Sequence, residues 1–194
     1  GRHVRLVPLS LAHADALRDA AADGELWGLL FTSVPGLAPG EMERYIETAL
    51  AQRDAGVSLP FAVLDAGGDV VGCTRYYDVD GSVPRVKIGY TWYAARAQRS
   101  ALNTEAKRLL LDHAFDALRC ASVTFETSHL NLRSQAAIER LGAQCDGVLR
   151  AHMRHRDGSL RDTVVYSILS AEWPALRARL SARLAAHEGV MSDV

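Results

Sequence analysis

The 194-residue chain has few cysteines, and none of them is paired by a motif. Cys73, Cys120 and Cys145 are isolated, and no CxxC occurs. An odd number of separated cysteines excludes a disulfide framework and a zinc knuckle, and it is typical of a reducing compartment. We therefore expect a cytoplasmic protein in which the cysteines are buried and structural.

Long apolar runs and an excess of one charge are also missing. No stretch approaches the ~20 apolar residues that cross a bilayer, and the start GRHVRLVPLS lacks the hydrophobic segment of a signal peptide. Lys and Arg number 22 against 23 Asp and Glu, a formal net charge of -1. We therefore expect neither a membrane protein nor a general nucleic-acid binder, although a local basic patch remains compatible with this balance.

Known nucleotide and metal motifs are absent as well. The chain contains neither GxxxxGK[ST] nor GxGxxG, which excludes a P-loop and a Rossmann fingerprint. Its two closest histidines, His152 and His155, are three residues apart, so on a strand they would point to opposite faces. We expect no metal site.

What is present is a pattern of alternating strands and helices in a chain that is 48% hydrophobic, enough for one domain over residues 1–194. Alternation predicts strands, and 3.6-residue periodicity predicts helices. Hairpins near both ends flank strand–helix–strand crossovers, so we expect an α/β fold with a mostly antiparallel, twisted mixed sheet flanked by helices. We expect strands within 3–9, 60–80, 85–93, 122–128 and 148–169, and helices at 11–21, 41–56, 103–120, 131–142 and about 171–188.

The C-terminal helix carries a leucine stripe at Leu176, Leu180 and Leu184. Such a stripe is typical of core packing and also of a helix that contacts a second copy of the chain. Its spacing does not separate the two interpretations, so a homodimer stays open.

The stretch AQRSALNTEAKRLLL, residues 97–111, leads from a predicted strand into a predicted helix. The first N–H groups of a helix lack intrahelical acceptors and carry a partial positive charge, so they can bind a phosphate group. No proline removes an N–H between Gln98 and Thr104, and Arg99 adds charge. Most strand-to-helix junctions bind nothing, so this feature alone does not identify a ligand.

Four short motifs occur in the order and at the spacing that is typical of one protein family. They are the segment 98–103 followed by TEA at 104–106, IGY at 88–90, N-x-x-S at Asn131 and Ser134, and LGA at 141–143 with GVLR at 147–150. The chain resembles the GNAT superfamily of acetyl-CoA-dependent N-acetyltransferases, most closely its RimJ/RimL-like branch, from His3 to about Leu169. The resemblance implies a single GNAT-like domain with a C-terminal helix.

The resemblance also implies a site for acetyl-CoA. Its pyrophosphate would lie at the helix start, its pantetheine arm would pair with the end of the 85–93 strand, and an arginine would meet the nucleotide phosphate. The implied cofactor residues are Trp92, Tyr93, Ala94, Arg99, Ser100, Ala101, Leu102, Asn103, Thr104, Asn131 and Arg140, with Arg133 as an alternative to Arg140. A plain helix cap is an equally good interpretation of Asn131.

The chain departs from the family signature at two of these positions. Ala101 stands where the family has Gly, and Asn103 where Gly or Ala is usual. A Cβ at a position with positive φ costs about 1 kcal/mol, so we expect φ at Ala101 to be negative. Asn103 is a candidate helix cap, and a cap that occupies N–H groups would compete with a phosphate.

Amine acetylation requires that a protonated amine lose its proton before it attacks. Many family members place a Glu before IGY and a Tyr in the helix after the Asn, whereas this chain has Lys87 and Ile138. We therefore name Glu126 as the candidate general base and His129 as the second choice. Ser134 is a candidate for stabilising the leaving thiolate.

The acceptor is the least defined part of the prediction. Trp27, Phe31, Tyr76 and Arg150 are candidate substrate-binding residues, although aromatic residues at this spacing are more often core. Arg150 belongs to a basic stripe with His152, Arg154 and Arg156, which would attract an acidic acceptor or a ribosomal partner if it is not simply a solvated face.

The resemblance thus predicts an enzyme that moves an acetyl group from acetyl-CoA to a primary amine, on a protein N-terminus or a small molecule. The attack would be direct, in a ternary complex, because no cysteine has the setting of a nucleophile. The alternative is a non-catalytic acyl-CoA-binding or interaction module, which the absence of both usual proton-transfer groups favours.

Overall fold

A computed structural model describes residues 1–192 of the chain. The strands are β1 (Val4–Pro8), β2 (Ser58–Asp65), β3 (Val70–Asp80), β4 (Arg85–Tyr93), β5 (Ser122–Ser128), β6 (Gln144–Arg154) and β7 (Leu160–Leu169). The helices are α1 (Ala14–Ala22), α2 (Glu41–Asp54), α3 (Ala101–Asp112), α4 (Leu132–Leu141) and α5 (Trp173–Ser192).

The strands form one seven-stranded sheet in the order β1-β2-β3-β4-β5-β7-β6. Neighbouring strands are antiparallel except β4 and β5, which are parallel and are joined through α3. The expected α/β fold with a mostly antiparallel sheet is therefore confirmed. The single parallel pair lies at the centre of the sheet and divides it into two halves.

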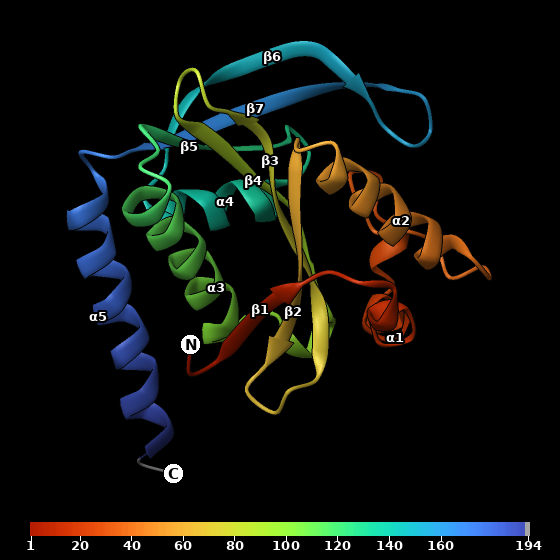
Figure 1. The fold of residues 1–194 in the computed structure, drawn as a ribbon, viewed down its shortest axis with the longest axis horizontal. Coiled ribbons are helices and arrows are strands. Elements are labelled where there is room, and N and C mark those ends of the chain that lie inside the picture. The colour runs from red at the N-terminus through yellow and green to blue at the C-terminus, as the bar shows by residue number, and fades with distance from the viewer. Residues whose placement is uncertain (193–194) are drawn as a thin grey trace.

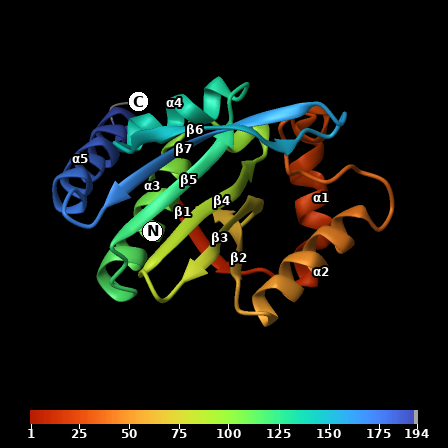
Figure 2. The same ribbon diagram turned by 90° about the horizontal axis from the view of Figure 1, so that it is seen from above.

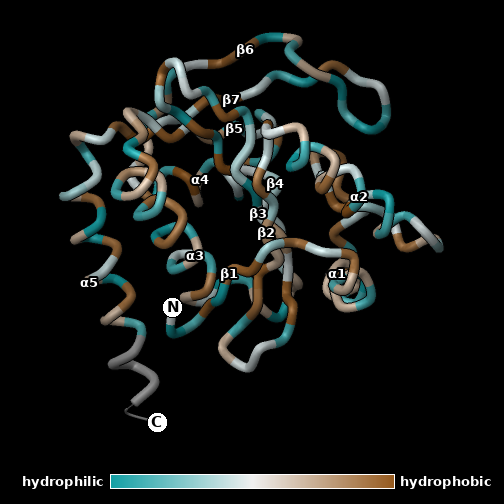
Figure 3. Tube along the Cα trace, viewed as in Figure 1, coloured by the Kyte–Doolittle hydropathy of each residue, from teal (hydrophilic) through white to brown (hydrophobic). Residues whose placement is uncertain are grey.

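Helices cover both faces of the sheet. Figures 1 and 2 show α1 and α2 on one face and α3 with α5 on the other, while the β6–β7 hairpin reaches across towards α2. Hydrophobic residues concentrate along the strands and on the helix sides that face them, and the tip of the β6–β7 hairpin is hydrophilic (Figure 3). We refer to the two sides as the α2 face and the α3 face.

The leucine stripe of α5 belongs to the core. Leu180 and Leu184 are 1% and 6% exposed, and Leu176 packs against the cluster formed by α3, β5 and β7. Burial of these side chains within the same chain stabilises the fold by about 1.5–3 kcal/mol each. The core interpretation of the stripe is therefore correct, and the buried leucines are not free to contact a second copy.

The helix that follows β4 begins earlier than its polar sequence indicates. We expected a start at Asn103, whereas α3 begins at Ala101 with Ser100 as its N-cap, and the Ser100 Oγ accepts a hydrogen bond from the Leu102 N–H at 3.3 Å. Asn103 lies in the first turn and is not the cap. Serine is as good an N-cap as asparagine, so sequence preference does not decide between the two positions.

Candidate active site

The pairing of β4 with β5 stops part of the way along both strands. Their register runs from Arg85 opposite Ser122 to Lys87 opposite Thr124 and, within the described residues, no further. Beyond Lys87 the β4 strand has an irregular register against β3, and Tyr90 adopts a left-handed conformation with φ of 50°. A bulge of this kind redirects side chains and leaves the strand edge without a partner.

Gly89 leaves room for a tyrosine ring beside the same bulge. A Cβ at this position would lie 2.7 Å from Cε1 of Tyr77, which packs directly over the strand. The absence of a side chain lets the Tyr77 and Tyr90 rings meet edge to face with centroids 5.2 Å apart. The IGY sequence thus places two aromatic rings on the α2 face where β4 and β5 separate.

A cavity of about 660 Å³ opens at the start of α3. Three helices surround it, since α4 and α5 face the first turn of α3. Four arginines line it, from all three segments: Arg99, Arg133, Arg140 and Arg183. The expected phosphate-binding residues therefore lie together. Arg183 and His187 of α5 were missed, because the leucine stripe of α5 was compatible with core packing and with a second copy, and so did not show that α5 lies beside α3.

Backbone N–H groups at this helix start are open. In the described chain, no carbonyl or side chain accepts from the N–H groups of Ser100, Ala101 and Asn103, whereas the Leu102 N–H is taken by Ser100. Ala101 has a negative φ, as expected, and the positive φ of 59° falls on Arg99 instead. The Cβ of Ala101 therefore causes no strain at the helix start.

The side chain of Asn103 lies at the same helix start. Its Oδ1 atom is buried and has no hydrogen-bond partner among the residues that the structure describes. A buried polar atom without a partner costs about 1–3 kcal/mol, so such atoms are rare unless a ligand completes them. Open N–H groups and four arginines fit the pyrophosphate and nucleotide end of coenzyme A, whereas the Asn103 oxygen requires a hydrogen-bond donor, which a pyrophosphate does not offer.

The end of β4 is less open than expected. The Ala94 N–H donates to the Val71 carbonyl at 2.7 Å, and a Cβ on Gly72 would meet the Trp92 carbonyl oxygen at 2.0 Å, so both backbone groups face β3. The Tyr93 carbonyl accepts from the Gln98 side chain at 2.9 Å. The Trp92 carbonyl and the Ala94 N–H are therefore directed at β3 and not at a pantetheine arm, because the strand alternates its hydrogen-bonding direction.

Asn131 and Ser134 form the start of α4. The Asn131 Oδ1 accepts from the Ser134 N–H at 3.1 Å, the geometry of an N-cap. The capping interpretation of Asn131 therefore holds for its oxygen, and its amide NH₂ remains as a donor. Ser134 sits in the first turn of α4, which faces the cavity at the start of α3.

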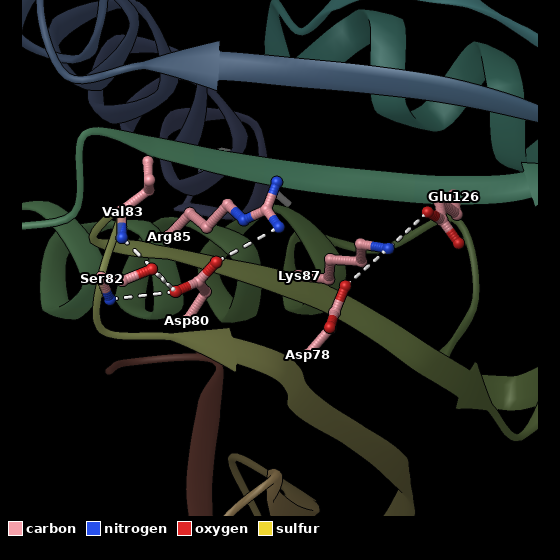
Figure 4. A network of polar contacts seen from close by, with 7 residues as sticks. All are labelled: Asp78, Asp80, Ser82, Val83, Arg85, Lys87 and Glu126. Carbon is pink, nitrogen blue, oxygen red and sulfur yellow. Dashed lines mark hydrogen bonds and ion pairs between the residues drawn. The ribbon is translucent and has the colours of Figure 1, made fainter.

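Lys87 joins the two separating strands. Its Nζ lies 2.6 Å from Glu126 Oε1 and 2.8 Å from Asp78 Oδ2, and Figure 4 shows the side chain extending between them. Burial by itself would lower the pKa of Lys87, but its hydrogen bonds to Asp78 and Glu126 outweigh this effect and raise it. Glu126, the candidate base, is thus held beside a permanent cation just beyond the last β4–β5 pair.

His129, the second candidate base, points towards the β6–β7 hairpin. Its Nδ1 lies 3.2 Å from the Asp162 carbonyl oxygen of β7, and its ring is 6.2 Å from that of His155. These contacts tie the end of β5 to the β6–β7 hairpin. Among the described residues no group of three or more His, Cys, Asp or Glu side chains could hold a metal ion.

The predicted acceptor residues are not brought together. Tyr76 is 2% exposed and faces α3, where its hydroxyl donates to the Leu110 carbonyl, so it is a core residue. Arg150 is exposed on β6. Trp27 and Phe31 are half-buried in the segment between α1 and α2, and the Trp27 carbonyl accepts from Arg156.

A second cavity, of about 480 Å³, lies on the α2 face instead. The loop before α2, the helix itself, β3, β4 and the β6–β7 hairpin all contribute to its wall. Tyr45, Arg75 and Tyr90 form its floor, and Arg44 and Arg156 stand beside them. We missed Arg75 and Tyr45 in the sequence, because no local pattern links β3 to α2.

The cysteines differ in their surroundings. Cys73 and Cys120 are buried, and burial raises the pKa of each thiol. Cys145 is exposed on β6, contrary to the expectation that all three are buried. A thiol with a raised pKa is a poor nucleophile, so neither buried cysteine has the setting of a reactive one.

Comparisons with known proteins agree with this geometry. A "Putative ribosomal N-acetyltransferase YdaF" of Bacillus subtilis (strain 168) is 30% identical over 106 residues, which span 55% of this chain and 57% of that protein. The fold matches a "putative acetyltransferase" from T. thermophilus with a TM-score of 0.84 and 39% identity, covering 95% of each chain. A GCN5-related N-acetyltransferase from Brucella melitensis matches with a TM-score of 0.85 and 33% identity, covering 95% of this chain and 83% of that one.

The family is shown by a match to a family model that spans most of the chain. Residues 3–144, from β1 to the start of β6, match the acetyltransferase (GNAT) domain. This span includes the β4 bulge, the start of α3 and the cap of α4. The resemblance in the motifs is therefore confirmed, and the chain belongs to the GNAT acetyltransferase family.

Proposed function

We propose that this protein transfers an acetyl group from acetyl-CoA to a primary amine by direct attack in a ternary complex. One observation carries the proposal. An arginine-lined cavity with open helix N–H groups lies at the start of α3, the helix that follows β4, and a second cavity, lined by Tyr90 of β4, lies on the α2 face. Two separate binding spaces are what a two-substrate transfer requires.

Acetyl-CoA supplies a thioester, whose carbonyl carbon is the electrophile. The residues at the start of α3 bind and orient its charged end through the N–H groups of Ser100, Ala101 and Asn103 and through the arginines around them. Because Arg99, Arg133 and Arg140 are exposed, they neutralise phosphate charge while staying in contact with water. We assign the amide NH₂ of Asn131, at the start of α4, as a donor to the pantetheine arm.

Proton removal is the task that the chain itself must perform. We assign it to Glu126, which accepts the amine proton directly or through water. The Nζ of Lys87 lies 2.6 Å from Glu126 Oε1 and holds this carboxylate just beyond the last β4–β5 pair. In the transfer, an N–C bond forms and the C–S bond breaks with its electron pair on sulfur. Before attack, Glu126 takes one proton from the ammonium group and releases it to water. After attack, it accepts a second proton from the nitrogen and passes it to the thiolate, so the products are the amide, the CoA thiol and one proton in solution.

The acceptor is either a protein N-terminus or a small amine. The name of the Bacillus relative refers to a ribosomal substrate, and that relative matches this chain over 57% of its own length. A ribosomal-protein N-terminus is therefore the macromolecular candidate, and it would place this protein in the cytoplasm. No described helix combines the length and the apolar character needed to cross a bilayer.

A second candidate function is an acyl-CoA-binding module without turnover. Ile138, which stands at the position of the family's tyrosine, is buried in the core and has no hydroxyl to protonate a thiolate. Glu126 is also already engaged by Lys87. These two observations favour loss of catalysis. The intact start of α3 argues against loss of the cofactor site.

One experiment separates the candidates. Calorimetry measures CoA binding, and a thiol-release assay with acetyl-CoA then screens amino acids, polyamines and peptides with free N-termini. Binding with robust release of CoA for at least one acceptor supports the enzyme. Binding without release for any acceptor supports the module, and failure to bind CoA at concentrations well above micromolar contradicts both.

A further inference from the structure

The cavity on the α2 face is surrounded by positive charge that the protein does not neutralise. Arg44, Arg75 and Arg156 line it, and Glu41 is the one carboxylate among the described lining residues. Within the described chain, none of the three arginines forms an ion pair with a carboxylate. A concave site with a surplus of one charge concentrates ligands of the opposite charge.

Arg75 is the most unusual of the three. It is 2% exposed, and its Nη1 donates to Gln52 Oε1 at 3.2 Å, a neutral acceptor. Its guanidinium lies between two aromatic rings, 4.7 Å from the centroid of Tyr45 and 4.4 Å from that of Tyr90. Its Nε is buried and has no partner among the described residues. A buried guanidinium that keeps a donor unpaired is costly unless a ligand supplies the acceptor.

The neighbouring arginine of the hairpin is held in place. Arg156 donates from Nη1 to the Trp27 carbonyl and from Nη2 to the Val34 carbonyl, both at 2.6 Å. These neutral acceptors fix the side chain over the segment between α1 and α2 without cancelling its charge. The cavity therefore has one buried cation on its floor and one positioned cation on its wall.

This charged cavity adjoins the place where the reaction would occur. Tyr90, which forms part of its floor, belongs to the β4 bulge and packs against Tyr77. The Tyr77 ring lies 5.9 Å from the Nζ of Lys87, and Lys87 contacts Glu126. A molecule bound over Arg75 is thus separated from the candidate base by two aromatic side chains and one ion pair.

We propose that this cavity binds a carboxylate of the acceptor, and that Arg75 is its principal ligand. The acceptor class is then an amine that also carries a carboxylate: a free amino acid or short peptide, or a polypeptide with an acidic residue next to its N-terminus. This inference rests on the proposed function, because it assigns the cavity to the acceptor. A guanidinium with fixed geometry suits a carboxylate better than a neutral amide.

The proposal competes with a purely structural role, in which Arg75 does no more than support Tyr90 in its left-handed conformation. That role would make the protein indifferent to charge on the ligand. The two interpretations therefore differ in the binding of ligands that have the same shape and differ by one charge.

The experiment measures binding, without turnover, of acetylated peptides as product analogues in the presence of CoA. One isosteric pair is N-acetyl-Ala-Ala with a free carboxylate against the same peptide with a terminal amide. The other is N-acetyl-Ala-Asp-amide against N-acetyl-Ala-Asn-amide. Calorimetry should show that the charged member of at least one pair binds ~10-fold or more tightly. The first pair reports a terminal carboxylate, and the second an acidic side chain.

Arg75→Met keeps much of the side-chain volume and should abolish this preference while leaving the neutral peptides unaffected. Arg53→Met is the matched control, since Arg53 is exposed on α2, pairs with Asp54 and lies outside the cavity. Should Arg75→Met fail to fold, Arg44→Gln tests the same site from its rim and should reduce the preference several-fold.

The outcomes separate the inference from the proposed function. Equal binding within both pairs, preference for the neutral members, or no binding of any peptide at ~10 mM overturns the carboxylate site. If the charged peptides are preferred and no unacetylated acceptor is turned over, the carboxylate site stands and the catalytic proposal fails. If an acceptor is turned over and no carboxylate is preferred, the catalytic proposal stands and the carboxylate site fails.

Discussion

The two cavities of this protein differ in the groups that they offer to a negatively charged ligand. At the start of α3, the candidate phosphate-binding groups are backbone N–H groups and long arginines that remain exposed. On the α2 face, Arg75 is buried between Tyr45 and Tyr90 and its position is fixed. The arginines of the first site are exposed, whereas the guanidinium of the second is buried between two rings. The difference suits a carrier shared by a whole family on one side and a particular acceptor on the other.

The largest expected effect concerns proton transfer. It should change the rate of catalysis without changing the binding of CoA. Glu126→Gln removes the candidate base and should lower kcat by ~10²–10⁴-fold, because the amine can no longer pass its proton to a carboxylate. The dissociation constant of CoA should not change, since Glu126 lies outside the cavity at the start of α3. Steady-state kinetics and calorimetry on one preparation test both statements.

Asp78→Asn is the matched control for this prediction. Asp78 also contacts Lys87, at 2.8 Å, but is half exposed and lies on β3. Its loss should reduce kcat less than ~10-fold if Glu126 is the base. Equal effects of the two substitutions would show that the ion pair with Lys87 matters and that Glu126 has no separate role.

The Lys107 side chain extends from α3 to Thr91, next to the β4 bulge. It therefore lies between the helix of the cofactor side and the strand that borders the acceptor cavity. Its Nζ donates to Thr91 Oγ1 at 2.6 Å and to Thr74 Oγ1 at 3.4 Å, and burial lowers the pKa of this amine to about 7. Above about pH 7 the folded protein releases this proton, whereas the unfolded chain keeps it until about pH 10.4. Stability should therefore rise with pH across this window.

Lys107→Met isolates this contribution. Met is of similar length and needs no hydrogen bond, so the variant should be more stable than the wild type at pH 6. Its advantage in the free energy of unfolding should shrink by a few kcal/mol between pH 6 and pH 10. Urea unfolding of both proteins at each pH measures the difference. An advantage that stays constant over this range would show that Lys107 is charged in the fold, contrary to the prediction.

Ala101→Pro tests whether the backbone carries recognition on the cofactor side. Proline is well tolerated at the first position of a helix, and Ser100 already has the extended conformation, φ −106° and ψ 178°, that the residue before proline favours. The substitution therefore deletes one open N–H without breaking α3. CoA should bind ~10-fold more weakly, and the carboxylate preference of the other cavity should be retained.

Ala101→Ser keeps this N–H and serves as the control for its added bulk. It should bind CoA within a factor of ~2 of the wild type. A proline variant that binds CoA as tightly as the serine variant would mean that arginine charge alone holds the phosphates. The contrast between the two cavities would then rest on burial and not on the use of the backbone.

The same contrast explains what the sequence predicted and what it did not. The cofactor side lies in consecutive residues, 98–104, so its motif and its missing proline were visible in the chain. β5 was predicted to the residue because β-branched and aromatic residues alternate between two turns. Local patterns of this kind do not require knowledge of the partner strand.

The acceptor side depends on contacts that no local pattern encodes. Tyr76 and Tyr77 are adjacent on β3, and alternation alone does not tell which of them faces α3. The structure turns Tyr76 into the core and leaves Tyr77 over Gly89. Arg75 becomes a candidate ligand because α2 supplies Tyr45 and the β4 bulge supplies Tyr90, from segments 30 and 15 positions away along the chain.

The smallest expected effect concerns α5, the element of the cofactor side that the sequence did not reveal. Arg183 lines the cavity at the start of α3 from an exposed position, so Arg183→Gln should weaken CoA binding by about 3-fold. The loss should disappear in ~1 M salt, where screening acts over about 3 Å. Arg179→Gln, on the same helix but outside the cavity, should leave CoA binding unchanged in low salt. If both variants bind alike, α5 closes the cavity by packing alone, and the charged groups of the cofactor side belong to α3 and α4.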